Sequence, residues 1–277
     1  RAVLIQQALG VPFRTFGENL FNDRAVVMPT AHDRAPLAQT DSIAMRAGWR
    51  WSIPLTTRIG KGYVYSSKYI SDDEAEAELR AAIGMEGSEQ PARFLQMKVG
   101  RVEDSWSRNC LAAGLSQGFI EPLEATALHI VIATALEFVR AYESGGFTAG
   151  HRDAFNRKAA LRYEGIRDYI VAHYRMNQRS DTPYWRDNAT NQALSDGLKA
   201  MVTAWFTQQD IAGANAAAYE EPHYSAMSWN CLFAGYGTFP PHEKLQPLPA
   251  NALAGDPDAT GAMLDACCAN FAELARA

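Results

Sequence analysis

The segment Gly114–Thr126, which reads GLSQGFIEPLEAT, constrains this chain more than any other. In it two carboxylates, Glu121 and Glu124, flank a proline just before a strongly apolar stretch. Proline favours the first turn of a helix, and the free N–H groups of a helix start favour an anion. A carboxylate fixed beside them could exchange a proton with a bound molecule. By itself the pattern is also that of an ordinary helix start, so both readings are open at this point.

A second segment, Gly48–Pro54, reads GWRWSIP. Trp49 and Trp51 occupy alternate positions, so both indoles face the same side if the segment is extended. A pair of aromatic residues on one face is also typical of a half-buried strand with no special role. The segment therefore predicts a strand that carries two tryptophans on one face.

Strand-like segments alternate with turns before residue 107. Short runs rich in β-branched and aromatic residues, bounded by glycine or proline, are typical of strands. A turn that leads directly into another such run indicates a hairpin. The strands that we expect are 25–29, 48–55, 63–65 after a turn at 58–62, and 93–99.

Helices are expected on both sides of residue 107. Ser71 and Glu74 form a capping-box pattern, which predicts a helix that ends near Gly84. Apolar residues at helical spacing predict a core helix over 123–139 with one apolar face. That face is made of Leu128, Val131, Ile132, Ala135, Leu136 and Val139. Further helices are expected at 155–174, at 194–205 and from about 258, after a proline-rich loop at 240–249.

The alternation of these elements predicts an α+β fold. We expect a sheet-rich part over 1–107 and a mainly helical module, which would bind the substrate, over 108–277. With 277 residues, 47% hydrophobic residues and 21% charged residues, the composition is that of a globular protein. A net charge of −5, with basic residues scattered among acidic ones, argues against a nucleic-acid or anionic-membrane surface.

Cysteine usage indicates a reducing compartment. The four cysteines show no CxxC pair and no histidine at zinc spacing, so no metal site is expected. No signal peptide precedes the body of the chain, and the stretch after Leu123 is short for a membrane span and carries charges. These features predict a cytoplasmic location and no membrane contact.

One motif competes with the carboxylate interpretation. Gly114, Ser116 and Gly118 match G-x-S-x-G, the nucleophile elbow of α/β-hydrolases, and His173, His223 or His242 could be named as its base. An elbow serine is followed at once by a helix, however, and Pro122 would then fall inside that helix. The context therefore argues against a hydrolase.

Together the two segments, in this order, resemble the flavin-dependent halogenases of the tryptophan-halogenase type. The tryptophan segment matches the WxWxIP pattern of that family at every defined position, and Glu121-Pro-Leu-Glu124 matches its second motif. The resemblance runs from Arg1 to about Pro240. It implies the C-terminal part of a FAD/NAD(P)-binding, glutathione-reductase-like flavoprotein fold.

The resemblance also implies roles for individual residues. Glu124 would be the catalytic acid or base. Thr126 and Ala127 would hold chloride or bromide, and Tyr224 and Trp229 would help to build the substrate pocket. The residues that would lie along the flavin are Trp49, Trp51, Ile53, Pro54 and Leu128.

The family implies reduced FAD from a separate flavin reductase, halide, and a small aromatic substrate such as tryptophan or another indole. A homodimer is compatible with it. The chain departs from the family at Ala127, where many members have glycine, so the halide geometry is open to question. No G-x-G-x-x-G turn occurs, and none of Lys61, Lys68 and Lys98 occupies the motif of the family's catalytic lysine. We therefore expect the C-terminal portion of a longer enzyme, inactive as it stands.

Two other functions remain open from the sequence. A flavin monooxygenase of the same fold would hydroxylate its substrate without productive halide binding, and the alanine at position 127 is compatible with it. A helical fragment that binds no flavin is the other possibility, because the phosphate-binding turn is missing from the chain.

Overall fold

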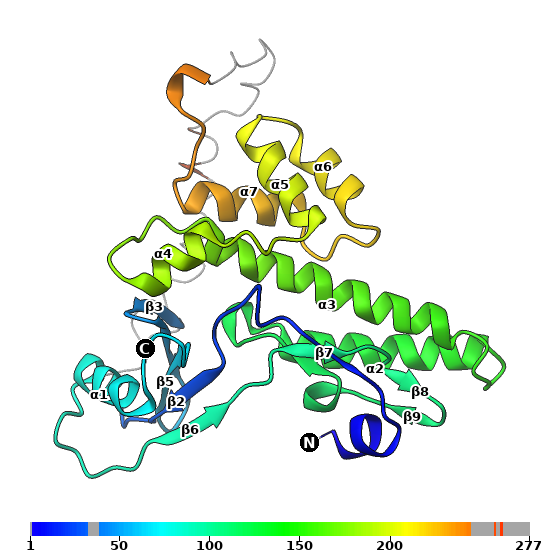
Figure 1. The fold of residues 1–277 in the computed structure, drawn as a ribbon, viewed down its shortest axis with the longest axis horizontal. Coiled ribbons are helices and arrows are strands. Elements are labelled where there is room, and N and C mark those ends of the chain that lie inside the picture. Colours follow the sequence, from blue (N-terminus) through cyan, green and yellow to red (C-terminus); the bar gives the residue numbers. More distant parts are fainter. Residues whose placement is uncertain (1, 33–38, 245–257, 259–260, 263–277) are drawn as a thin grey trace.

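The sheet-rich part is built on a five-stranded antiparallel sheet with the order β3-β4-β5-β2-β6 (Figure 1). A computed structural model of the chain describes residues 2–32, 39–244, 258 and 261–262. The strands of this sheet are β2 (Arg24–Val27), β3 (Asp41–Met45), β4 (Gly48–Pro54), β5 (Ile59–Tyr65) and β6 (Arg93–Gln96). The expected strands are confirmed, and β4 and β5 form the expected hairpin, although β5 begins at Ile59 rather than at residue 63.

Helix α1 (Asp72–Ile83) packs against this sheet. The Ser71 side chain accepts a hydrogen bond from the Glu74 amide, and the Glu74 carboxylate accepts one from the Ser71 amide. Gly84 then takes the left-handed conformation, with a φ of 70°, that ends many helices. Both ends of the helix lie where the sequence predicts them, because both are set by local hydrogen bonds.

Short strands connect the sheet to the helices. A three-stranded sheet has the order β1-β7-β10, and β8 pairs with β9 in a hairpin. Their bounds are β1 (Phe13–Thr15), β7 (Gly100–Val102), β8 (Trp106–Ser107), β9 (Cys110–Leu111) and β10 (Gly118–Phe119). A π-helical turn, Val3–Ala8, precedes these strands. Of two 3₁₀ turns, Gly114–Ser116 comes just before β10 and Leu123–Ala125 comes after it.

The helical part is organised by α3, the long helix that crosses the centre of Figure 1. Helix α2 runs alongside it, and the group of α5, α6 and α7 covers its other side. The bounds are α2 (Ala127–Ser144), α3 (Arg152–Arg175), α4 (Pro183–Thr190), α5 (Asp196–Phe206), α6 (Ile211–Ala218) and α7 (Ala226–Gly235), with a 3₁₀ turn at His242–Lys244. The expected helices at 155–174 and 194–205 are confirmed as α3 and α5.

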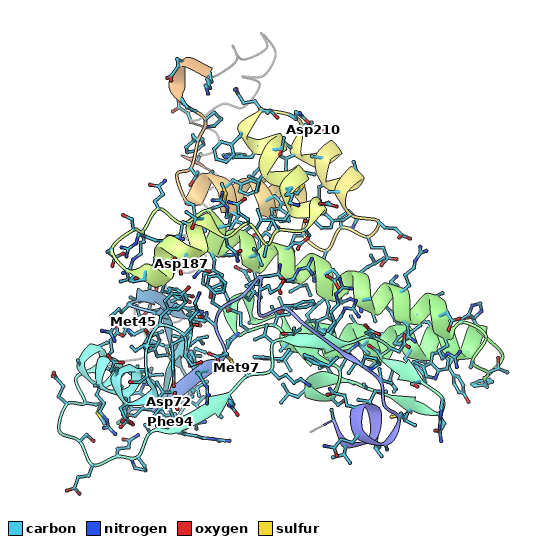
Figure 2. The ribbon with its side chains drawn as sticks, viewed as in Figure 1. Met45, Asp72, Phe94, Met97, Asp187 and Asp210 are labelled. Carbon is cyan, nitrogen blue, oxygen red and sulfur yellow. The ribbon has the colours of Figure 1, made fainter. Side chains whose placement is uncertain are left out.

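Helix α4 joins the two parts. It lies beside the end of β3, as the positions of Asp187 on α4 and Met45 on β3 show (Figure 2). There the Trp185 indole N–H donates to the carbonyl of Met45 at 2.8 Å. One hydrophobic cluster extends from Tyr63 in the sheet to Ile170 in α3 and Phe233 in α7. The sheet and the helices therefore share a continuous core. The domain boundary near residue 107 stays a prediction; β10, which follows it, pairs with β7, which precedes it.

The expected core helix over 123–139 is wrong in two respects. Regular α-helix begins only at Ala127, because Glu124 and Ala125 have positive φ angles of 65° and 52°. The apolar face is also exposed rather than buried: Leu128 is 76% and Ile132 58% exposed, and Leu136 and Val139 are exposed as well. The side chains that α2 buries are those of Ile130 and Thr134 instead. The helix expected from about 258 lies outside the described residues for most of its length.

Candidate active site

The turn that carries Glu124 has an unusual backbone. Leu123–Ala125 forms a 3₁₀ turn in which the Ala125 amide donates to the carbonyl of Pro122 at 3.0 Å. Glu124 and Ala125 are both left-handed. A non-glycine residue in this region costs about 1–3 kcal/mol, which the surrounding structure must offset. Two strained residues in succession single out this turn as a functional candidate.

Glu124 has one histidine as its partner. Its carboxylate Oε1 lies 3.2 Å from Nε2 of His173 in α3, and its side chain is 39% exposed. The hydrogen bond from His173 is the largest cause that lowers the pKa of Glu124, against the opposing effect of partial burial. Glu124 is therefore a partly accessible carboxylate held in a defined position, as a general acid or base requires.

Glu121, three residues earlier, is buried at 2% exposure and has a different task. Oε1 accepts hydrogen bonds from Tyr174 Oη at 2.6 Å and Trp49 Nε1 at 3.2 Å, and Oε2 accepts one from Asn22 Nδ2 at 3.1 Å. Burial raises the pKa of Glu121, and these three donors oppose the shift. The carboxylate ties the loop before Glu124 to β4, to α3 and to the segment before β2.

The two tryptophans of β4 lie on one face, as predicted, with ring centroids 6.1 Å apart. Trp49 is 7% exposed and is held by Glu121, whereas Trp51 lines a cavity of about 530 Å³ together with Phe119 and Pro122. Ile53 and Pro54 lie at the far end of β4, where they pair with β5, and neither lines this cavity. Of the expected flavin contacts, only Trp51 lines this cavity.

The expected halide residues lie at the start of α2. No side chain caps this helix, and its first turn carries no acidic residue. The first N–H groups of such a helix have no partner within it and form a positive end. Thr126, Ala127 and Leu128 line a second cavity, of about 130 Å³, at this place. Ala127 does not have a positive φ, so the backbone does not require glycine there.

An aromatic wall stands beside His173. Tyr169 and Tyr224 are stacked with ring centroids 3.6 Å apart, and Tyr169 lies edge-on to His173 at 5.1 Å. The buried hydroxyl of Tyr224 has no hydrogen-bond partner among the described residues. Trp229 is 1% exposed and packs edge-on behind Tyr169. It supports the wall from the core, and its role in substrate binding stays a prediction.

Sequence reasoning missed two members of this site. In the sequence His173 stands only as a possible base of a hydrolase, and Tyr169 lies unmarked inside the helix expected at 155–174. Both lie four residues apart on α3, the spacing that puts side chains on one helix face. The signal for them was therefore present, but nothing local links that face to Glu124, which precedes His173 by 49 residues.

The hydrolase interpretation of Ser116 has no support in the geometry. Ser116 lies in a 3₁₀ turn rather than between a strand and a helix, and its hydroxyl donates to the carbonyl of Ala113 at 2.8 Å. The helix that follows nearest, α2, begins only at Ala127. A nucleophile elbow needs the serine exposed on a strand-to-helix turn.

Two further properties of the described residues bear on function. No group of three or more His, Cys, Asp or Glu side chains in this part of the chain could hold a metal ion. Residues 123–144 have the length and apolar composition of a membrane-crossing helix, and a single helix of this kind is weak evidence. Glu137 on that helix forms ion pairs with Arg162 and Lys158 of α3.

The chain matches known proteins over most of its length. A family model described as tryptophan halogenase matches residues 1–250. Tryptophan 6-halogenase SttH of Streptomyces toxytricini is 38% identical over 94% of this chain and 49% of its own length. The 7-chloro-L-tryptophan 6-halogenase KtzR of Kutzneria sp. is 38% identical over 86% of this chain and 46% of its own length.

Solved structures agree with these relatives. The crystal structure of SttH matches with a TM-score of 0.83 at 36% identity, covering 96% of this chain and 53% of that chain. BrvH, a flavin-dependent halogenase from Brevundimonas sp. BAL3, matches with a TM-score of 0.82 at 32% identity, covering 99% of this chain and 54% of that chain. The chain thus spans about half the length of the relatives that it matches, and its fold is the expected one. Sequence and structure together show that it belongs to the tryptophan halogenase family of flavin-dependent halogenases.

Proposed function

We propose that this chain is part of a flavin-dependent halogenase that replaces a ring hydrogen of an aromatic substrate, tryptophan or another indole, with chlorine or bromine. The observation that carries the proposal is the position of Glu124. It is held in a strained turn between an uncapped helix start and a wall of aromatic rings, inside the motif that the family shares.

The residues of the chain fit the groups that such an enzyme uses. The cavity beside Trp51, Phe119 and Pro122 is lined largely by apolar side chains, which suits a flat aromatic ring system such as a flavin. The smaller cavity at the start of α2 is lined by Thr126 and Ala127 and also by buried Glu121, whose pKa is raised by burial. The first turn of α2 carries no acidic residue, and the positive end of the helix suits a halide. When bound, reduced FAD would supply, with O2 and halide, the oxidation of halide to an electrophilic form. The reduced flavin would come from a separate reductase.

The chain's own residues then have separate tasks. Tyr224, which is half-buried and stacked on buried Tyr169, offers aromatic surface for the substrate ring, and aromatic pairs contribute about 0.5–1.5 kcal/mol beyond area burial. Glu124 accepts the proton that the ring carbon loses when the carbon–halogen bond has formed. Its partial exposure lets that proton leave to solvent. Glu121 and Trp49 hold the loop of Glu124 against β4.

Product mass tests this proposal directly. The protein, extended to the full length of its relatives, would be incubated with FAD, a flavin reductase, NADH, bromide and a panel of indoles. A brominated product that requires bromide is expected. A hydroxylated product formed without halide would replace the proposal with a flavin monooxygenase.

A further inference from the structure

We infer that His173 is a positioning residue that shares one proton with Glu124, so that the acid–base unit of this site is the Glu124–His173 pair and not Glu124 alone. The catalytic meaning of the pair rests on the proposed function. The existence of the shared proton does not, because it follows from the contacts of the two side chains.

The first step is the state of Nδ1 of His173. It lies 2.9 Å from the carbonyl oxygen of Tyr169, one helical turn earlier in α3. A carbonyl can only accept, so Nδ1 must carry a hydrogen. The side chain of His173 is 11% exposed, so water does not readily replace this contact. The imidazole is thereby oriented by the backbone of its own helix.

The second step is the other nitrogen. Nε2 of His173 lies 3.2 Å from Oε1 of Glu124. Because Nδ1 already carries a hydrogen, a hydrogen bond between Nε2 and Oε1 needs one more proton. If that proton is on Nε2, the pair is an imidazolium and a carboxylate; if it is on Oε1, the pair is a neutral imidazole and a carboxylic acid. Both arrangements place one proton between the same two atoms. The lowered pKa of Glu124, with the hydrogen bond to His173 as its largest cause, favours the first.

The third step is the surroundings of the pair. The titratable groups that face Glu124 from α3 and from the α6–α7 region are Tyr169, Tyr224 and Tyr236. Burial raises the pKa of Tyr169 and of Tyr236 to about 12, and that of Tyr224 as well, so all three hydroxyls are neutral near pH 7. His173 also lowers the pKa of buried Glu121 through its charge. Among the groups of the described residues that act on the pKa of Glu124, His173 is the one that lowers it, first through its hydrogen bond and then through its charge.

The pair has a consequence for proton transfer. When the substrate ring loses its hydrogen as a proton, the C–H bonding electrons return to the ring and the proton goes to Glu124. The imidazolium keeps Glu124 ionised before this step and holds its carboxylate in the strained turn. The added proton then leaves to solvent through the exposed part of Glu124. Loss of His173 would therefore change both the ionisation and the position of the acceptor.

The test on the chain itself needs no activity. Carboxyl ¹³C shifts of Glu124 would be followed by NMR against pH in the wild type, in His173→Leu, and in His151→Leu as the control, since His151 is exposed. We expect the titration midpoint of Glu124 to rise in His173→Leu and to stay unchanged in His151→Leu. Ring ¹⁵N shifts should show the proton on Nδ1 of His173. An unchanged titration midpoint of Glu124 in a folded His173→Leu variant would contradict the shared proton. An Nδ1 of His173 that carries no hydrogen would contradict it as well.

A second variant protects the test against misfolding. His173→Gln can still donate an N–H to Glu124 but cannot lose its proton, so the midpoint of Glu124 should lie between those of the wild type and His173→Leu. In the full-length enzyme, His173→Leu should lower kcat about 10- to 100-fold, part of the effect of general acid–base catalysis, with little change in KM. The pH profile of kcat should lose one ionisation in His173→Gln.

The two claims can fail separately. If the titration midpoint of Glu124 rises in His173→Leu but the full-length enzyme forms no halogenated product, the shared proton is supported and the proposed function is contradicted. Halogenation with the same pH profile in the wild type and in His173→Gln would confirm the function and remove the pair.

Discussion

The indole N–H of Trp49 donates a hydrogen bond to Oε1 of Glu121 at 3.2 Å, across 72 residues of sequence. This contact joins the two segments that carry the resemblance to the family, because one end lies on β4 and the other in the loop that leads to Glu124. The first motif is therefore attached physically to the second, and the position of Glu124 depends on a buried carboxylate that does not itself face solvent.

Replacing Glu121 by Gln should destabilise the fold. The carboxylate of Glu121 accepts three hydrogen bonds, from Asn22 Nδ2, Trp49 Nε1 and Tyr174 Oη. The amide nitrogen of a glutamine at this position would face either Asn22 or both Trp49 and Tyr174, and it cannot accept their hydrogen bonds. Leaving a buried donor without an acceptor costs about 1–3 kcal/mol. Denaturant unfolding of Glu121→Gln should show a loss of that size, and exposed Glu143→Gln, as the control, should show almost none. Equal stabilities of the two variants would mean that the network carries no net energy.

The same carboxylate gives a pH dependence with a defined sign. Burial raises the pKa of Glu121 in the folded state above its unfolded value, so the folded state binds more protons in the interval between the two. The contribution of this group to stability is thus fully present below the unfolded value and decreases as the pH rises through the folded value. The difference in unfolding free energy between wild type and Glu121→Gln should therefore change with pH above about 4.5, whereas the Glu143→Gln difference should stay flat.

The exposed face of α2 predicts a difference between two kinds of polar substitution. Ile132→Gln with Leu136→Gln alters side chains that are 58% and 53% exposed, so unfolding free energy should change by no more than about 1 kcal/mol for the pair. Light scattering should show less self-association, because an exposed apolar patch is reduced. Ile130→Gln, at a position 4% exposed on the same helix, should cost about 2 kcal/mol or more. Similar losses at both faces would contradict the orientation of α2.

His223 should make the fold sensitive to acid. Its pKa is lowered from 6.5 to about 4, first by burial and then by the positive charges of His129 and Arg162. For a base with a depressed pKa, stability is fully present above the unfolded value and is lost as the pH falls towards the folded value. The Tm of the wild type should therefore drop more than that of His223→Gln between pH 6.5 and 4. His151→Gln serves as the exposed control, and parallel curves for wild type and His223→Gln would refute the assignment.

Local signals in the sequence predicted most of the sheet and the best-capped helix. The capping box of Ser71 and the alternation around Trp49 act within a few residues, and both elements formed as expected. The short helices α4, α6 and α7 were not anticipated, although Thr182, Asp210 and Ser225 cap them with their side chains. These caps are real signals, but segments of this length have too little periodicity to be distinguished from loops.

Tertiary relationships could not be read in the same way. The apolar periodicity of α2 was correct, yet periodicity identifies a face and not what covers it, so the exposure of Leu128 and Ile132 was missed. Glu124 is indicated by the resemblance of its segment to a family motif. Its partner His173 and the strained backbone of its turn depend on packing between α3 and a distant loop, which has no local signature.

The most direct measurement of the central claim separates halogenation from flavin oxidation in Glu124→Gln, prepared in the full-length enzyme beside the wild type and Glu143→Gln. Oxygen consumption with reduced FAD and the mass of the indole product would be followed together. We expect halogenated product to fall by about 10²-fold or more in Glu124→Gln, as for a lost general base, while flavin oxidation stays close to the wild-type rate. Undiminished halogenation, or an equal loss of both activities, would contradict the role of Glu124 as the proton acceptor of the halogenation step.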